Sequence, residues 1–213
     1  MKSFSQIKLC IFDFDSTLMD GETVDLLADA YGVADKVIGI THKAMNGELD
    51  FFESLTHRVS LLKGMPCELV DEVCENLPLM RGACELISYL KERKIRILVM
   101  SGGFLEALNK TKKRLDFDLG FANFLHSKNG LLTGLVGGEM MQADSKGLML
   151  ARLKTLLNLK QGEIMCVGDG ANDLAMFKES GLRIAFCAKP ILKQNADLCI
   201  DTKDLAQIIK ELQ

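Results

Sequence analysis

The chain has 213 residues, about one and a half times the length of a usual domain, so we expect one domain with a sizeable insertion. Hydrophobic residues make up 48% and charged residues 26%, which allows a large core and excludes a chain dominated by disorder. The net charge of −3 argues against nucleic acid or an anionic membrane as a partner.

The amino terminus and the cysteines favour a cytoplasmic location. Residues 1–15 do not resemble a signal peptide, because the apolar run 9–12 is short and meets an aspartate at once. No stretch approaches the roughly 18 apolar residues of a membrane helix. The seven cysteines are odd in number, widely spaced and without a C-x-x-C motif, so neither a disulfide framework nor a thiolate zinc site is expected. This pattern is typical of a reducing compartment.

Short apolar runs alternate along the chain with segments of helical periodicity. The predicted strands are residues 8–14, 96–100, 164–167, 183–187 and 197–200. The predicted helices are residues 82–93, 104–115, 146–157, 171–178 and 203–212. This alternation predicts an α/β fold with a doubly wound, mostly parallel, Rossmann-like sheet and helices on both faces.

Two segments depart from this alternation. Residues 19–78 contain four helix-like segments and no convincing strand, so we interpret them as a helical cap domain inserted after strand one. Residues 1–18 and 79–213 then form the catalytic core. Residues 124–141 carry Asn129-Gly130 between two extended runs, which predicts a β-hairpin.

Acidic residues follow two of the predicted strands, where an open parallel sheet binds its ligands. Asp13 and Asp15 are two residues apart, so in an extended chain they point the same way and repel each other. Asp169 and Asp173 follow the strand 164–167. An oxygen-only set of ligands without histidine suits Mg²⁺. The alternative is that these acids cap turns and helices, but four acids at two strand ends favour a metal site.

Two further features predict a site for a phosphate group. Ser101-Gly102-Gly103 follows the strand 96–100 and is expected to open a helix, where free backbone N–H groups can cradle phosphate. Taken alone, this segment is better explained as an ordinary strand-to-helix turn with serine as the helix cap. Lys146 lies in the first turn of a predicted helix, where the helix dipole disfavours a cation. Either a bound anion or nearby carboxylates reverse that preference, or the lysine lies in solvent.

Four motifs, taken together and in this order, resemble those of the haloacid-dehalogenase superfamily. They are DFDSTL at 13–18, Ser101-Gly102-Gly103, Lys146 and GDGAND at 168–173. Within this superfamily, the chain resembles the short phosphoserine phosphatases. The segments that carry this resemblance are KAMNGELDF at 43–51, RVSLLKGMP at 58–66 and AFCAKPILK at 185–193. The resemblance covers nearly the whole chain. Leu148 departs from it, because the family often has glutamate there.

The resemblance implies a magnesium-dependent hydrolase that converts O-phospho-L-serine to L-serine and phosphate, the last step of serine biosynthesis. Asp13 would be the nucleophile and a metal ligand. Asp15 would be the acid and base and would give its backbone carbonyl to the metal. Asp169 would be the third protein ligand of the metal. Asp173 would contact the ligands without binding the metal itself.

The resemblance also implies how the substrate is held. Ser101, Gly102, Lys146 and Asn172 would bind the phosphoryl group. Glu22 would receive the substrate ammonium group and Arg58 its carboxylate, with the insertion closing over them as a lid. From the residues alone, the better interpretation is that Glu22 is an acid favoured in the first turn of a helix and Arg58 is a surface residue, and the resemblance reverses that preference.

Other functions remain open at this point. A phosphatase or phosphotransferase for a different small ester fits the same motifs. A receiver-type signalling domain also clusters acids, a hydroxyl group and a lysine around Mg²⁺, but it does not need the insertion at 19–78. The sequence is compatible with a monomer or a homodimer.

Overall fold

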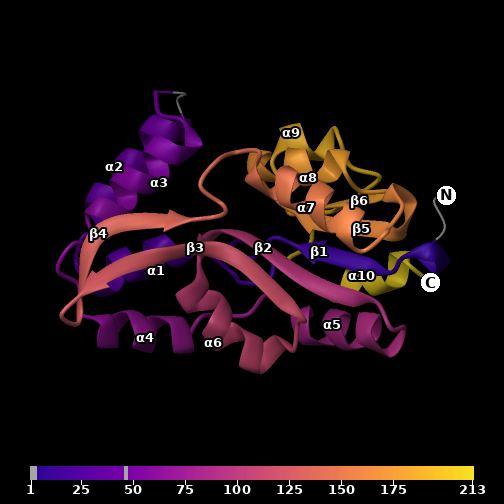
Figure 1. The fold of residues 1–213 in the computed structure, drawn as a ribbon, viewed down its shortest axis with the longest axis horizontal. Helices are drawn as coiled ribbons and strands as arrows, with labels where there is room; N and C mark the ends of the chain where they lie inside the picture. Colours follow the sequence, from indigo (N-terminus) through magenta and orange to yellow (C-terminus); the bar gives the residue numbers. More distant parts are fainter. Residues whose placement is uncertain (1–3, 46–47) are drawn as a thin grey trace.

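The computed structural model describes residues 4–45 and 48–213, except the side chains of residues 42–45. Within this part, the centre of the molecule is a seven-stranded sheet in the order β4-β3-β2-β1-β5-β6-β7 (Figure 1). Its strands are β1 (Leu9–Phe12), β2 (Arg96–Phe104), β3 (Leu119–Lys128), β4 (Leu131–Gly138), β5 (Ile164–Gly168), β6 (Leu182–Phe186) and β7 (Leu198–Ile200). Neighbouring strands are parallel except β3 and β4, which confirms the predicted sheet.

Helices cover both faces of this sheet. One face carries α5 (Ala83–Glu92), α6 (Leu105–Leu115) and α10 (Ala206–Glu211); the other carries α7 (Ser145–Leu156), α8 (Leu174–Lys178) and α9 (Pro190–Lys193) (Figure 1). Short 3-10 turns occur at η1 (Phe4–Gln6), η2 (Gln161–Glu163) and η3 (Ala171–Asp173). The predicted helix 171–178 is therefore divided into η3 and α8, and α9 was not predicted. In the described part of the chain, no helix is long and apolar enough to cross a membrane.

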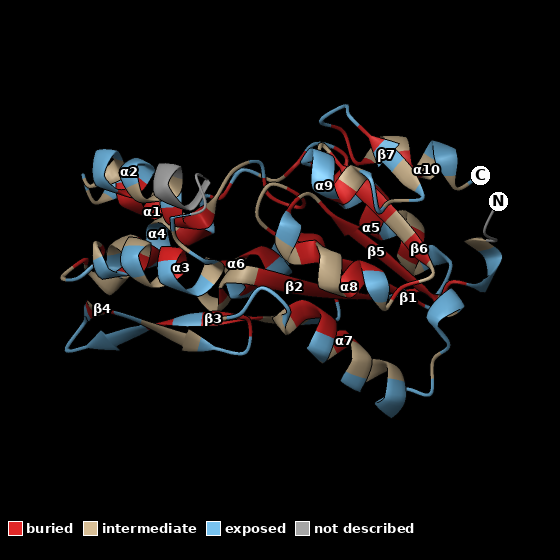
Figure 2. Cartoon of the chain, turned by 90° about the horizontal axis from the view of Figure 1, so that it is seen from above, coloured by how far each residue is buried: buried red, intermediate tan, exposed pale blue. Residues whose placement is uncertain are grey.

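Strand β1 shows why the sheet lies at the centre of the core. Cys10 and Phe12 pack with the residues of α5 and α6, while Leu9 and Ile11 pack with those of α7 and α8. All four side chains are fully buried, and Figure 2 shows that β1 and its neighbours β2 and β5 are mostly buried. A run of apolar residues without alternation is what a strand covered on both faces requires.

The segment between β1 and α5 is helical, as predicted. It contains α1 (Thr23–Ala30), α2 (Ala34–Met45), α3 (Phe51–Ser60) and α4 (Cys67–Glu75). Helix α3 begins with a capping box in which the Asp50 side chain accepts from the N–H of Glu53 and the Glu53 side chain accepts from that of Asp50. The buried apolar residues of these helices belong to the same cluster as those beneath the sheet. The division into a core and a cap domain at 19–78 stays a prediction.

The predicted hairpin is formed by β3 and β4. Asn129 and Gly130 at its turn both have positive φ, at 53° and 77°, as a tight type I′ turn requires. The hairpin also contacts the segment before α4. The N–H of Gly64 donates to Leu132 O at 2.8 Å, and the N–H of Leu132 donates to Met65 O at 2.9 Å.

Strand β2 differs from its prediction. We expected it to end at Met100 and a turn at 101–103 to open the next helix. Instead β2 continues to Phe104, with a register shift against β3 after Met100, and α6 begins at Leu105. The pairing with β3 extends the strand, and a strand that ends by pairing with a distant segment leaves no local signal in its own sequence.

Candidate active site

The candidate site lies at the carboxyl ends of β1, β2 and β5. These strands are neighbours, with β1 between β2 and β5. The chain runs outward from β1 through β2, β3 and β4 and then returns to β5 on the other side of β1, so the crevice lies at the switch point of the sheet. The N–H of Asp13 donates to Val167 O at 2.9 Å, which continues the pairing of β1 with β5 by one residue. Asp13 therefore lies at the carboxyl end of the central strand β1.

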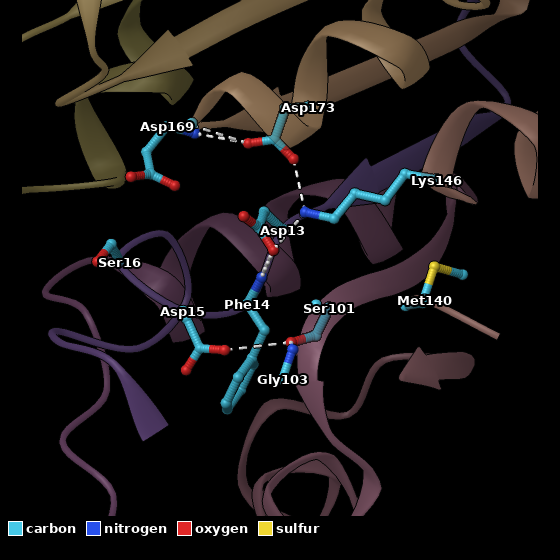
Figure 3. Close-up of polar contacts among 12 residues, drawn as sticks. Asp13, Phe14, Asp15, Ser16, Ser101, Gly103, Met140, Lys146, Asp169 and Asp173 are labelled. Atoms are coloured by element: carbon cyan, nitrogen blue, oxygen red, sulfur yellow. Dashed lines mark hydrogen bonds and ion pairs between the residues drawn. The ribbon is translucent and has the colours of Figure 1, made fainter. Parts of the chain in front are cut away.

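Lys146 lies between two carboxylates in this crevice (Figure 3). Its Nζ is 2.7 Å from Asp13 Oδ1 and 2.6 Å from Asp173 Oδ1. Burial by itself lowers the pKa of Lys146, but the two carboxylates raise it more, so the net shift is upward and the ammonium stays charged. Of the alternatives left open for this lysine, the structure shows nearby carboxylates, and it excludes a lysine that lies in solvent.

Asp173 shapes the loop after β5. While its Oδ1 accepts from Lys146, its Oδ2 accepts from the N–H groups of Asp169 and Gly170, both at 3.0 Å. A Cβ at Gly168 would lie 2.3 Å from the same Oδ2, so this close approach requires glycine. Since both oxygens of Asp173 already accept hydrogen bonds, its placement favours support of the site over metal ligation.

One carboxylate oxygen each from Asp13, Asp169 and Asp173 lies within 4.8 Å of the others, and in this cluster Asp13 and Asp169 are the candidate metal ligands. Burial, with Asp173 next in importance, raises the pKa of Asp13 well above its usual range and that of Asp169 to about 7. Desolvated acids that repel one another are stabilised by a bound cation. The oxygen-only ligands therefore fit a hard divalent ion such as Mg²⁺.

Asp15 is held by hydrogen bonds on both of its oxygens. Oδ1 accepts from the N–H of Thr23 at 2.8 Å and from its Oγ1 at 2.5 Å. Oδ2 accepts from Ser101 Oγ at 3.2 Å, as Figure 3 shows. Burial raises the pKa of Asp15, and the Thr23 and Ser101 donors oppose the shift. Thr23 was not predicted as a site residue. It contacts Asp15, eight residues earlier, only because the chain turns back after β1, and the local sequence does not indicate that turn.

The site opens into a cavity of about 420 Å³ between the sheet edge and the helices α1 and α3. Of the predicted site residues, its lining contains Asp13, Asp15, Glu22, Arg58, Gly102, Asp169 and Asn172. Ser101, Lys146 and Asp173 lie directly behind this surface, at 0%, 3% and 0% exposure. All the predicted site residues are therefore brought to one place.

Glu22 and Arg58 face this cavity from the helical segment. Glu22 Oε1 accepts from Ser16 Oγ at 2.7 Å, and Arg58 Nε donates to Ser54 O at 3.4 Å. Burial, followed by the charge of Asp15, raises the pKa of Glu22 to about 7, and the positive charge of Arg58 opposes that shift. Glu22 and Arg58 thus bring one carboxyl group and one guanidinium group of the helical segment to this cavity.

The lining also contains residues that were not predicted as site residues. Among them are Asp25, Asp50, Phe51 and Lys189. Phe51 marks the contact between α3 and the end of β2, because a Cβ at Gly102 would lie 2.8 Å from its ring. Phe51 and Lys189 fall inside segments that resemble the family, at 43–51 and 185–193, which is the one signal that could have identified them.

Comparisons with known proteins agree with this geometry. A sequence model of the family described as haloacid dehalogenase-like hydrolase matches residues 7–181. A phosphoserine phosphatase of Campylobacter jejuni subsp. doylei is 63% identical over 204 residues, covering 96% of this chain and 99% of the relative. A phosphoserine phosphatase of Methanocaldococcus jannaschii is 47% identical over 206 residues, covering 97% of this chain and 98% of the relative.

A solved structure described as a phospho-aspartyl intermediate analogue of phosphoserine phosphatase superposes with a TM-score of 0.91 at 47% identity, covering 97% of this chain and 99% of that one. A substrate-bound phosphoserine phosphatase complex matches with the same TM-score at 46% identity and the same coverage. The family match spans most of the chain, and the relatives match along nearly their whole length. The chain therefore belongs to the haloacid dehalogenase-like hydrolase family.

Proposed function

We propose that this chain hydrolyses O-phospho-L-serine to L-serine and phosphate through an aspartyl-phosphate on Asp13. The observation that carries the proposal is the position of Asp13, which lines the same cavity as Glu22 and Arg58 while Lys146 contacts its carboxylate at 2.7 Å. Relatives up to 63% identical that are named phosphoserine phosphatase support the same reaction, as does the similar structure described as a phospho-aspartyl intermediate analogue.

In the first step, a carboxylate oxygen of Asp13 attacks phosphorus, and the bond between phosphorus and the serine oxygen breaks. Phosphoryl transfer depends on positioning and on offsetting negative charge, because the attacking group and the phosphate are both anions. Lys146 supplies one positive charge next to Asp13. Asp13, Asp169 and the backbone carbonyl of Asp15 would hold a Mg²⁺ ion, which supplies further positive charge at the phosphoryl group when bound.

Asp15 moves the proton in both steps. It starts protonated and donates its proton to the departing serine oxygen, which leaves as neutral L-serine hydroxyl. It then accepts a proton from the water that attacks phosphorus, while the bond between phosphorus and Asp13 breaks and phosphate is released. The raised pKa of Asp15 supports this role, since a buried carboxyl group is more readily protonated at neutral pH.

Specificity for phosphoserine would come from the two charged residues of the helical segment. Glu22 pairs with the substrate ammonium group, and Arg58 pairs with its carboxylate. A ligand that lacks either group leaves one of these side chains buried without a partner, which costs binding free energy. Gly102 and Asn172 line the cavity on the other side, where they would contact the phosphoryl oxygens with Ser101 and Lys146 behind them.

The nucleophile is tested with Asp13→Asn. We expect turnover of phosphoserine to fall by at least about 10³-fold, because the amide cannot attack phosphorus. Labelled phosphoserine quenched in acid should leave an acid-stable phosphate on the wild-type protein and none on the variant. Asp35→Asn, an exposed acid in the first turn of α2, serves as the matched control and should keep wild-type turnover. Near-normal turnover by Asp13→Asn would refute the assignment.

The remaining parts of the proposal concern the setting of the reaction. We propose Mg²⁺ as the metal, the cytoplasm as the location, serine biosynthesis as the pathway and a monomer or homodimer as the assembly. A phosphatase for a related ester, or a phosphotransferase, is the nearest alternative. Release of phosphate from a panel of phosphate esters tests for a phosphatase of a related ester. Formation of a new phosphate ester in the presence of an acceptor alcohol tests for a phosphotransferase.

A further inference from the structure

The lining of the cavity carries more acidic than basic side chains, whereas its proposed substrate is an anion. The described residues of its lining include the carboxylates of Asp13, Asp15, Glu22, Asp25, Asp50 and Asp169, against the cationic side chains of Arg58 and Lys189. Phosphoserine carries about two negative charges on its phosphate at neutral pH, so the molecule as a whole is an anion. A binding cleft of the same sign as its ligand slows association unless a local positive charge offsets the field.

Lys146 is poorly placed to attract a substrate from solution. It is 3% exposed, and Asp13 and Asp173 contact its ammonium group at 2.7 and 2.6 Å. Its charge is therefore screened by neighbouring carboxylates until the substrate is already bound. Arg58 lines the cavity from α3, and the proposed function assigns it to the substrate carboxylate.

Lys189 is the remaining cation of the described lining, and it is exposed. It precedes Pro190, the first residue of α9, and its backbone N–H donates to Asp169 O at 2.9 Å. This hydrogen bond fixes the lysine beside the loop that carries Asp169. Among the residues that the structure describes, Lys189 forms no ion pair within 4.0 Å, so no neighbouring carboxylate neutralises its ammonium group directly.

We infer that Lys189 is a positioning residue that draws the phosphate dianion into the cavity and guides it toward Asp13. The inference rests on the proposed function only in that the substrate carries a phosphate dianion. Lys189 acts on association of the substrate and on retention of the product phosphate. The bond-breaking steps at Asp13 and Asp15 do not depend on it.

The test compares Lys189→Gln with Lys178→Gln, which removes one exposed positive charge from α8 outside the cavity. With Mg²⁺ present, we expect Lys189→Gln to lower kcat/KM for phosphoserine by about three- to ten-fold at low ionic strength, with kcat changed less than about two-fold. The difference should shrink as salt is raised, because the Debye length falls from about 30 Å at 10 mM to about 10 Å at 100 mM. Lys189→Arg should restore the wild-type salt dependence, and Lys178→Gln should retain it.

Inorganic phosphate provides a readout that does not depend on turnover of phosphoserine. Its dissociation constant, measured by titration calorimetry on the magnesium-loaded protein, should rise by a similar factor in Lys189→Gln. If phosphoserine is not the substrate, this measurement still tests the inference. Unchanged phosphate binding in Lys189→Gln, or an unchanged salt dependence of kcat/KM, would overturn it. A fall in kcat that Lys189→Arg does not reverse would instead indicate a structural role through the Asp169 loop, which also overturns it.

Discussion

Lys146 and its two carboxylates show how a buried charge is tolerated at the level of single residues. The ammonium group has lost its water, and Asp13 and Asp173 replace that water at 2.6–2.7 Å. Removal of one partner from a buried ion pair costs about 3–5 kcal/mol, because the remaining charges are left uncompensated. The same arrangement keeps Asp13 oriented, so stability and reactivity depend on the same contact.

Glu22 gives a prediction for the pH dependence of substrate binding. Its pKa is raised to about 7, so the carboxyl group is increasingly protonated as the pH falls through that value. Its attraction for the substrate ammonium group is present above this pKa and is lost below it. We expect KM for phosphoserine to rise as the pH is lowered from about 8 to about 6, by up to about ten-fold per unit below the pKa.

Steady-state kinetics across this pH range measure the effect. Glu22→Gln should have a high KM that lacks this dependence, and Glu72→Gln, an exposed acid on α4, should behave like the wild type. Phosphoglycolate, which lacks the ammonium group, controls for titration of the phosphate itself. If phosphoserine and phosphoglycolate showed the same pH dependence in the wild type, Glu22 would not be the ammonium-binding residue.

The sequence predicted those site residues whose positions follow from local spacing. Asp13 and Asp15 are two apart after a buried strand, and Asp169 and Asp173 follow another, so the topology of a parallel sheet brings all four together. Thr23 and Lys189 could not be found this way. Their positions near Asp15 and Asp169 depend on how loops return to the sheet edge, which no periodicity encodes.

At the level of elements, the irregular end of β2 is the part of the site that local sequence described least well. Ser101, Gly102 and Gly103 remain within the strand, and the N–H of Gly103 donates to Ser101 Oγ at 2.8 Å. Ser101 in turn donates to Asp15. The extension of β2 along β3 therefore positions the proposed acid and base, in addition to forming part of the sheet.

Gly103→Ala tests this arrangement. A Cβ at Gly103 would lie 2.5 Å from Asp15 Oδ2 and 3.0 Å from Ser101 Oγ, so the Asp15 side chain has to move. We expect kcat to fall by about 10²-fold or more, because displacement of a proton donor by about 1 Å is costly.

Gly162→Ala is the matched control, since a Cβ there has no neighbour within 4 Å. Circular dichroism should show that both variants are folded. Wild-type kcat in Gly103→Ala would mean that Asp15 does not act from the position seen here.

At the level of the whole molecule, the cluster of acids sets the pH dependence of stability. Asp13, Asp15, Glu22 and Asp169 all have raised pKa values in the folded protein, so between about pH 4 and 7 the folded state binds more protons than the unfolded state. Their contribution to stability is therefore greatest at low pH and is lost as the pH rises through the folded pKa values. The metal-free protein carries its largest internal repulsion at alkaline pH.

We expect Mg²⁺ to raise the melting temperature more at about pH 8 than at about pH 6, because the ion binds the ionised carboxylates. Differential scanning fluorimetry with Mg²⁺ or with a chelator measures the shift, which should be several degrees at saturating metal. Asp169→Asn should remove most of the shift and should make the metal-free protein more stable than the wild type at about pH 8. An equal response to Mg²⁺ at both pH values would contradict this account of the acids.

The contact between the β3–β4 hairpin and the loop before α4 limits how the site can open. A lid joined to its base by two flexible linkers can rotate as a rigid body, but here backbone hydrogen bonds from Gly64, Cys67 and Leu132 fasten the far end of the helical segment to the central sheet. Rotation of the whole helical segment as one body would break these hydrogen bonds. A motion of α2 and α3 that widens access to Asp13 would instead leave α4 and the hairpin in place.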